Sequence, residues 1–125
     1  HKYSGLKSYG AAKMAQLQSM LKLNEYFSET DVTINAMHPG NVKTNSGSNN
    51  GKIYKFFKKN VVDRKARPLE ISSEALYYLG VSEDVKDISG KFFNLTTKEE
   101  PAPPALDMEA AEKLWTISLG LGGLK

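Results

Sequence analysis

The sequence contains no cysteine, and this absence excludes disulfide bonds and thiolate metal sites. Its two histidines, His1 and His38, are too few for a zinc or iron centre, so we expect no metal. No apolar run approaches the ~20 residues of a membrane-spanning helix, and the N-terminus has no apolar signal-peptide core. These absences are typical of a cytoplasmic protein.

The composition that remains is that of one globular domain over residues 1–125, with 40% hydrophobic and 25% charged residues. The net charge of +3 is unevenly distributed. Between Lys52 and Arg67 there are seven basic residues and one acid, Asp63, which makes that stretch +6 and leaves the remainder at −3. A local basic segment in a net acidic chain argues against nucleic acid as a partner.

A tyrosine and a lysine four residues apart, Tyr9 and Lys13, form the strongest chemical signal. On a helix this spacing places both side chains on one face. An ammonium near a phenol stabilises the phenolate and lowers the phenol pKa from about 10 toward neutral pH. The pair could therefore transfer a proton to or from a carbonyl group.

Two other pairs share this spacing, Tyr3/Lys7 and Tyr54/Lys58, so the spacing alone is weak evidence. Only the pair at positions 9 and 13 opens a long helical pattern, residues 8–28, that leads into a strand pattern at residues 31–37. That strand pattern ends in a Pro-Gly turn, and open α/β sheets bind ligands at the carboxyl ends of their strands.

The remaining pattern predicts a loop at residues 1–7, with Gly5 as its breaker, and a helix at 68–80 that begins with proline and ends with glycine. We expect a strand at 91–95, a stiff proline-containing connector at 96–105 and a final helix capped by Asp107. In that helix, Glu109 and Lys113 have i,i+4 spacing for an ion pair, and the helix should end at Gly120.

The segment between the strand pattern and the second helix is a turn-rich stretch, 45–51, followed by a basic and aromatic stretch, 52–59. The second stretch has the spacing of a short amphipathic helix. It could cover a substrate, contact an anionic membrane surface, or be a solvated lid without a partner. The sequence leaves these alternatives open.

Taken together, the motifs resemble the short-chain dehydrogenase/reductase family, and within it the retinol-dehydrogenase-like branch. The resemblance covers nearly the whole chain and is weakest between residues 45 and 67. The matching segments, which fall in the family's order, are Tyr9–Ala15, Val32–Thr44, Ser89–Phe93 and Ala110–Trp115.

The resemblance implies an α/β fold, the C-terminal part of a Rossmann-type, three-layer, doubly wound parallel sheet. This chain would supply the catalytic helix, the last two strands, a substrate loop at 45–67 and the C-terminal helix. Family members also have a glycine-rich nucleotide-binding turn and a catalytic serine roughly a dozen residues before the tyrosine. Neither lies within these residues, so the resemblance implies the C-terminal half of one domain without its nucleotide-binding half.

The implied activity is that of an NAD- or NADP-dependent oxidoreductase that interconverts a lipophilic alcohol and its carbonyl compound. Tyr9 would be the catalytic acid or base, and Lys13 would assist it and bind the cofactor ribose. His38, which precedes a proline, is expected to be structural. The other implied site residues are Pro39, Gly40, Val42 and Thr44 at the cofactor, and Ile53, Tyr54, Phe56 and Phe57 in the substrate loop.

Partners follow from the same considerations. The helix at 8–28 is implied to form a homodimer surface, and the segment 52–59 is a candidate for peripheral membrane contact. The alternative function is that of a truncated or non-catalytic homologue, which acts as a protein- or membrane-interaction module.

We expect that the isolated 125 residues do not form a stable monomer, because two strands cannot make a sheet that stands alone. Thermal unfolding of the isolated chain, followed by circular dichroism, should show no cooperative transition. A sharp cooperative melt would contradict this expectation.

Overall fold

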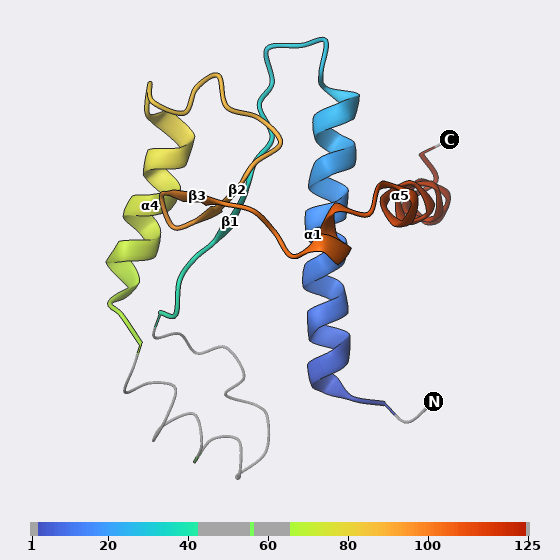
Figure 1. The fold of residues 1–125 in the computed structure, drawn as a ribbon, viewed down its shortest axis with the longest axis horizontal. Coiled ribbons are helices and arrows are strands. Elements are labelled where there is room, and N and C mark those ends of the chain that lie inside the picture. The colour runs from blue at the N-terminus through green and yellow to red at the C-terminus, as the bar shows by residue number, and fades with distance from the viewer. Residues whose placement is uncertain (1–2, 43–55, 57–65, 125) are drawn as a thin grey trace. The chain divides into compact units, whose positions relative to one another are not determined.

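The computed structural model describes residues 3–42, 56 and 66–124. In chain order their elements are α1 (Gly5–Tyr26), β1 (Ala36–His38), α4 (Leu69–Val81), β2 (Phe92–Asn94), β3 (Thr97–Glu99), the 3-10 helix η2 (Pro103–Leu106) and α5 (Met108–Gly122) (Figure 1). The described chain is thus a partial α/β fold, with three α-helices and one three-stranded sheet.

The chain divides into two compact units. The first contains His1–Ala36, Asp87–Phe93 and Lys98–Lys125, and the second contains Met37–Lys86 and Asn94–Thr97. The first unit therefore holds α1, η2 and α5, and the second holds α4.

Helix α1 begins earlier than expected. The prediction of a loop over residues 1–7 was wrong from Gly5 onward, because that residue starts the helix and the Ser8 N–H bonds the carbonyl of Ser4 at 3.0 Å. The helix also ends at Tyr26, two residues before the expected boundary. Glycine weakens a helix interior, but it is tolerated at the first position, where few intrahelical bonds are lost.

The starts of the other two helices were predicted correctly. Helix α4 starts directly after Pro68, and α5 starts after Asp107, whose Oδ1 accepts a 3.0 Å hydrogen bond from the Ala110 N–H. The pair formed by Glu109 and Lys113 has an Nζ–Oε1 distance of 2.7 Å. Helix α5 continues to Gly122, past the expected end.

The sheet has the order β1-β2-β3. Two hydrogen bonds give the relative direction of β1 and β2. The Gly90 N–H donates to the Ile34 carbonyl (2.8 Å), and further along both strands the Ala36 N–H donates to the Lys91 carbonyl (3.0 Å). This direction is that of a parallel pair. Strand β3 follows β2 after two residues, as in an antiparallel hairpin, and therefore makes the sheet mixed.

Two strand predictions need correction. The expected strand at 31–37 is present only from Ala36. The two residues before it bond to the neighbouring segment through side chains: the Ile34 N–H donates to the Ser89 hydroxyl, and the Asn35 side-chain amide donates to the Ile88 carbonyl. The connector expected at 96–105 contains β3, so the described residues form three strands where two were expected. All three residues of β3 are exposed, and so they lack the alternating apolar pattern that identifies strands in a sequence.

A polar network in the first unit connects the C-terminal part of α1 to the start of the sheet. The Ser89 hydroxyl donates to Asn24 Oδ1 (2.6 Å) and accepts from the Ile34 N–H (2.9 Å). Gly90, at φ 68°, lies against the same Asn24 carboxamide, where an added Cβ would be 2.8 Å from Nδ2. The turn therefore requires glycine both for its backbone angle and for its space.

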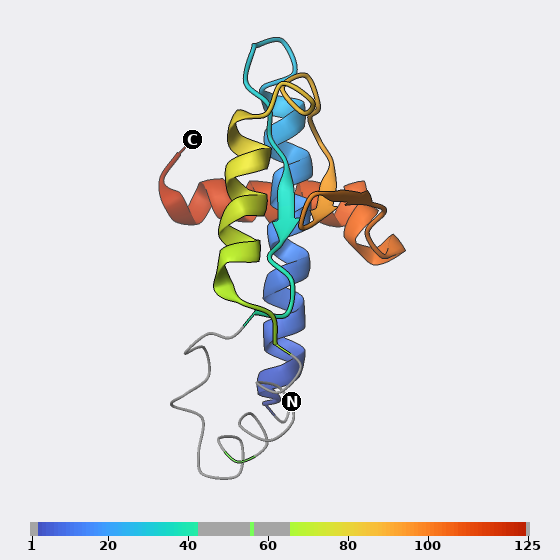
Figure 2. The same cartoon turned by 90° about the vertical axis from the view of Figure 1, so that its left-hand side faces the viewer.

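Helix α5 packs against α1 in the same unit; it is seen end-on beside α1 in Figure 1 and runs across it in Figure 2. Buried Met20 of α1 and buried Ala111 of α5 belong to this unit. The Gln18 amide, also buried, donates to the Pro104 carbonyl at 3.2 Å and so connects α1 with η2. At the other end of the junction, the Lys22 ammonium pairs with Glu25 and, at 2.6 Å, with Glu112 of α5.

The described residues bury few large apolar side chains. The buried apolar residues are Met20, Ala75, Val85, Phe93, Ala105 and Ala111. By contrast, the apolar side chains of Leu76 in α4 and Ile117 in α5 are 63% and 61% exposed. Within the described part of the chain, no helix has the length and apolarity needed to cross a membrane.

Replacing Gly90 with alanine should lower the free energy of unfolding by about 1 to 3 kcal/mol, because alanine is strained at positive φ and its Cβ meets Asn24. Gly120→Ala is the matched control. Gly120 lies in α5 with no atom within 4 Å of an added Cβ, and so alanine there should be neutral or stabilise by up to about 1 kcal/mol. Chemical denaturation of the chain in its natural sequence context measures both effects. Equal effects of the two substitutions would contradict the proposed role of the turn.

The Lys22 ion pairs predict a stability change at alkaline pH. Hydrogen bonds that the Lys22 ammonium donates to Glu112, first, and to Glu25 raise its pKa above the ordinary value of 10.5. The stabilisation is therefore complete below that value and is lost as the pH rises through the higher folded-state pKa. The stability difference between the natural chain and a Lys22→Met variant should shrink over this alkaline range.

Glu112→Gln should reduce the same pH dependence, because it removes the larger cause of the raised pKa. The free energy of unfolding is measured by denaturation at several pH values. Comparing each variant with the natural chain at the same pH removes the contribution of the other lysines and tyrosines that titrate in this range. A stability difference that stays constant through the alkaline range would show that the pair does not couple α1 to α5.

Candidate functional site

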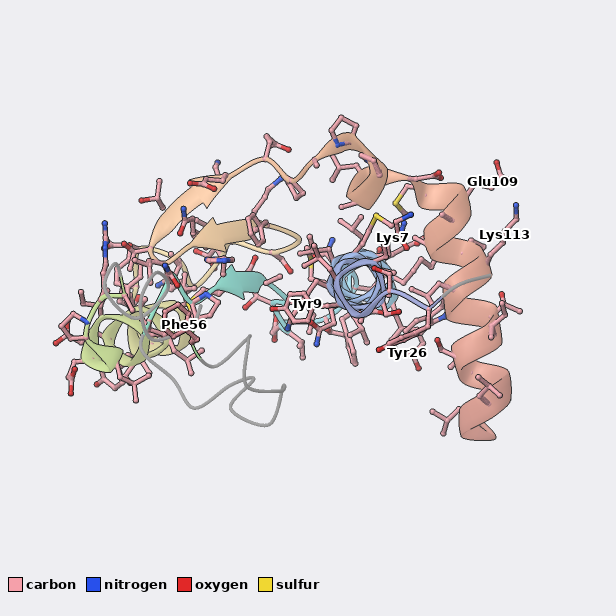
Figure 3. The ribbon with its side chains drawn as sticks, turned by 90° about the horizontal axis from the view of Figure 1, so that it is seen from below. Lys7, Tyr9, Tyr26, Phe56, Glu109 and Lys113 are labelled. Carbon is pink, nitrogen blue, oxygen red and sulfur yellow. The ribbon has the colours of Figure 1, made fainter. Side chains whose placement is uncertain are left out.

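Tyr9 and Lys13 lie one turn apart on the N-terminal half of α1. The Lys13 ammonium lies over the tyrosine ring, with Nζ 5.8 Å from the ring centroid, which is cation–π distance. The same ammonium donates a 2.9 Å hydrogen bond to Gln16 Oε1. The pair therefore shares one helix face, as the spacing predicted, while Lys7 projects from a different side of α1 (Figure 3).

The surface beside this pair consists of small residues and is open. Tyr9 is 63% exposed, and Ala11 and Ala12 are exposed as well. A Cβ added to Gly10 would meet no atom within 4 Å. A flat ligand could approach the phenol here without displacing any described side chain.

The Pro-Gly turn after β1 is held by two contacts. Gly40 adopts φ 76°, and its N–H donates to His38 Nδ1 at 3.0 Å. The Leu95 side chain packs where a Cβ of Gly40 would be, at 3.3 Å from its Cδ2. His38 therefore supports the turn, as the sequence predicted, and the turn needs glycine.

The chain after this turn pairs with the segment that precedes α4. Val42 and Arg67 form an isolated parallel bridge, and the Arg67 N–H donates to the Asn41 carbonyl at 2.8 Å. This bridge places Val42 and Arg67 side by side at the carboxyl end of β1.

The predicted site residues are therefore distributed as follows. Tyr9 and Lys13 belong to the first compact unit, whereas Pro39, Gly40 and Val42 belong to the second. Phe56 is described and 73% exposed. Thr44, Ile53, Tyr54 and Phe57 lie outside the described residues. The roles assigned to all of these residues remain predictions.

A pocket at the end of β1 combines His38 and Gly40, which the sequence singled out, with residues that it did not. Leu95 adopts φ 56° in the turn between β2 and β3, although leucine rarely takes a left-handed conformation. Together with its neighbours it lines a pocket of about 530 Å³, formed by His38, Gly40, Asn41, Arg67, Asn94, Leu95, Thr96 and Thr97. The sequence signals for this place were the Pro-Gly turn at the end of the strand pattern and the position of Arg67 at the end of the basic stretch.

Comparison with known proteins identifies relatives along nearly the whole chain, although no family model matches it. It is 31% identical to human (Homo sapiens) retinol dehydrogenase 13 over 128 residues, which are 99% of this chain and 39% of that protein. It is 33% identical to mouse (Mus musculus) retinol dehydrogenase 14 over 127 residues, 93% of this chain and 35% of that protein.

A third relative comes from a plant. The chain is 33% identical over 132 residues to the chloroplastic short-chain dehydrogenase TIC 32 A of Brassica napus, with 96% of this chain and 38% of that protein covered. The chain thus spans about two-fifths of the length of the curated relatives it matches. It is related in sequence to the retinol-dehydrogenase-like branch of the short-chain dehydrogenase/reductase family, and this relationship confirms the resemblance that its motifs predicted.

Proposed function

We propose that the protein carrying this chain is an NAD- or NADP-dependent oxidoreductase that interconverts a lipophilic alcohol and its carbonyl compound. The observation that carries the proposal is the pairing of Tyr9 with Lys13 on an exposed helix face, with the ammonium 5.8 Å from the ring centroid. The names of the relatives, retinol dehydrogenases and short-chain dehydrogenases, support the same reaction class.

In the proposed reaction Tyr9 handles the proton. During reduction, a hydride joins the carbonyl carbon, the C=O π electrons move to oxygen, and that oxygen takes the phenolic proton of Tyr9. Lys13 stabilises the phenolate that remains, and oxidation of the alcohol reverses each step. A bound nicotinamide would supply or accept the hydride, and the exposed surface of Gly10, Ala11 and Ala12 leaves room for its ring.

The proposed substrate is lipophilic because two groups of relatives are named retinol dehydrogenases, and because exposed Phe56 belongs to the predicted substrate loop. We propose in addition that α1 contributes to a homodimer. The exposed apolar side chains of Leu6 (84%) and Met14 (38%) support this use of the helix surface.

Tyr9→Phe removes only the phenolic hydroxyl and should lower kcat/KM by about 100-fold or more, which is the usual contribution of a general acid or base. The assay uses the chain in its natural sequence context, with NADH and NADPH, and retinal and simpler aldehydes as substrates. The melting temperature should not change, because Tyr9 is 63% exposed.

Tyr3→Phe is the matched control, because Tyr3 has the same spacing to Lys7 but precedes α1 and is 83% exposed. This control should keep full activity. If Tyr9→Phe also keeps full activity, the oxidoreductase mechanism is wrong, and the alternative of an interaction module is favoured.

A further inference from the structure

The pocket at the carboxyl end of β1 lies wholly within the second compact unit. Its volume of about 530 Å³ falls in the range of small-molecule sites, roughly 300 to 1,000 Å³. It is lined from three chain segments, namely the Pro-Gly turn, the residue before Pro68, and the turn between β2 and β3.

The lining of this pocket is rich in hydrogen-bond donors. Arg67 is the one cationic residue among the eight described residues that line it, and none of those eight is acidic. The Arg67 guanidinium is exposed and has no ion-pair partner among the described side chains. Guanidinium groups bind carboxylates and phosphates through two parallel hydrogen bonds.

The neighbouring side chains add donors of the same kind. His38 Nδ1 accepts the Gly40 N–H, so in the neutral ring the proton is on Nε2, which is left as a donor. Thr96 and Thr97 contribute exposed hydroxyl groups, which donate to anionic oxygens.

The framework of the pocket is tightly determined. Leu95 keeps a left-handed backbone, which costs a non-glycine residue about 1 kcal/mol or more, while its side chain packs against the turn at Gly40. The Leu95 N–H also donates to the His38 carbonyl at 3.0 Å. This contact holds the two turns together and keeps the donors of both facing one space.

We propose that this pocket binds a small organic oxyanion, a phosphate ester or a carboxylate, with Arg67 as its principal ligand and the Thr96 and Thr97 hydroxyls as secondary donors. The proposal goes beyond the redox reaction: its ligands are Arg67, Thr96 and Thr97, and of the residues that line the pocket only Gly40 is also a predicted cofactor residue. Its readout is therefore binding, and turnover is not needed.

The test titrates the chain, in its natural sequence context, with inorganic phosphate and, in a separate arm, with succinate. Sodium chloride keeps the ionic strength constant in both arms. Isothermal calorimetry should give saturable binding of one of the two anions, and the arm that binds identifies the oxyanion. Arg67→Gln should raise the dissociation constant about tenfold or more, because it removes the charge and the paired donors.

Two further variants keep the result interpretable. Thr97→Val retains the shape of an exposed side chain and should weaken binding by a smaller factor, even if Arg67→Gln proves poorly folded. Lys86→Gln removes an exposed lysine of the same unit that does not line the pocket, and it should leave binding unchanged. Absence of saturable binding in both arms, or equal weakening by Lys86→Gln and Arg67→Gln, would overturn the proposal.

Discussion

The hydrogen bonds of Asn24, Ser89 and Ile34 are the constraint on which the first unit depends. They connect three segments that are far apart in the sequence: the last turns of α1, the entry to β1 and the turn before β2. Because the carboxamide of Asn24 occupies the space beside Gly90, the turn cannot move without losing these bonds. The parallel pairing of β1 with β2 starts from this arrangement, and it leads to the Pro-Gly turn at the other end of β1.

The helices could be predicted from sequence because their signals are local. Pro68 before α4 and Asp107 before α5 mark helix starts through their own backbone or side chain, and both marks were correct. The strands could not be bounded in the same way. Residues 32–35 look like a strand, but the Ile34 N–H bonds the Ser89 side chain and the Lys91 N–H bonds the Asn35 side chain. Exposed β3 exists only because it pairs with β2.

The candidate site likewise contains one feature that local sequence determines and one that contacts between distant residues determine. The pairing of Tyr9 with Lys13 follows from helix geometry alone, and so its spacing was enough to predict a shared face. The pocket at Arg67 requires Leu95 in a left-handed conformation, and it requires glycine at position 40 because the Leu95 side chain occupies the space of a Cβ there. No local preference predicts that conformation for Leu95, since it arises from a contact between residues 55 positions apart.

The junction of α1 and α5 has a spectroscopic consequence. Trp115 is the single tryptophan of the sequence, and its ring lies 6.5 Å from that of Tyr26, beside the Lys22 ion pair. Tyr26 in turn meets Phe27 edge to face at 5.0 Å. Indole emission from this chain therefore reports on the packing of the two helices. An optical signal that follows one contact in this way distinguishes local undocking of α5 from unfolding of the rest.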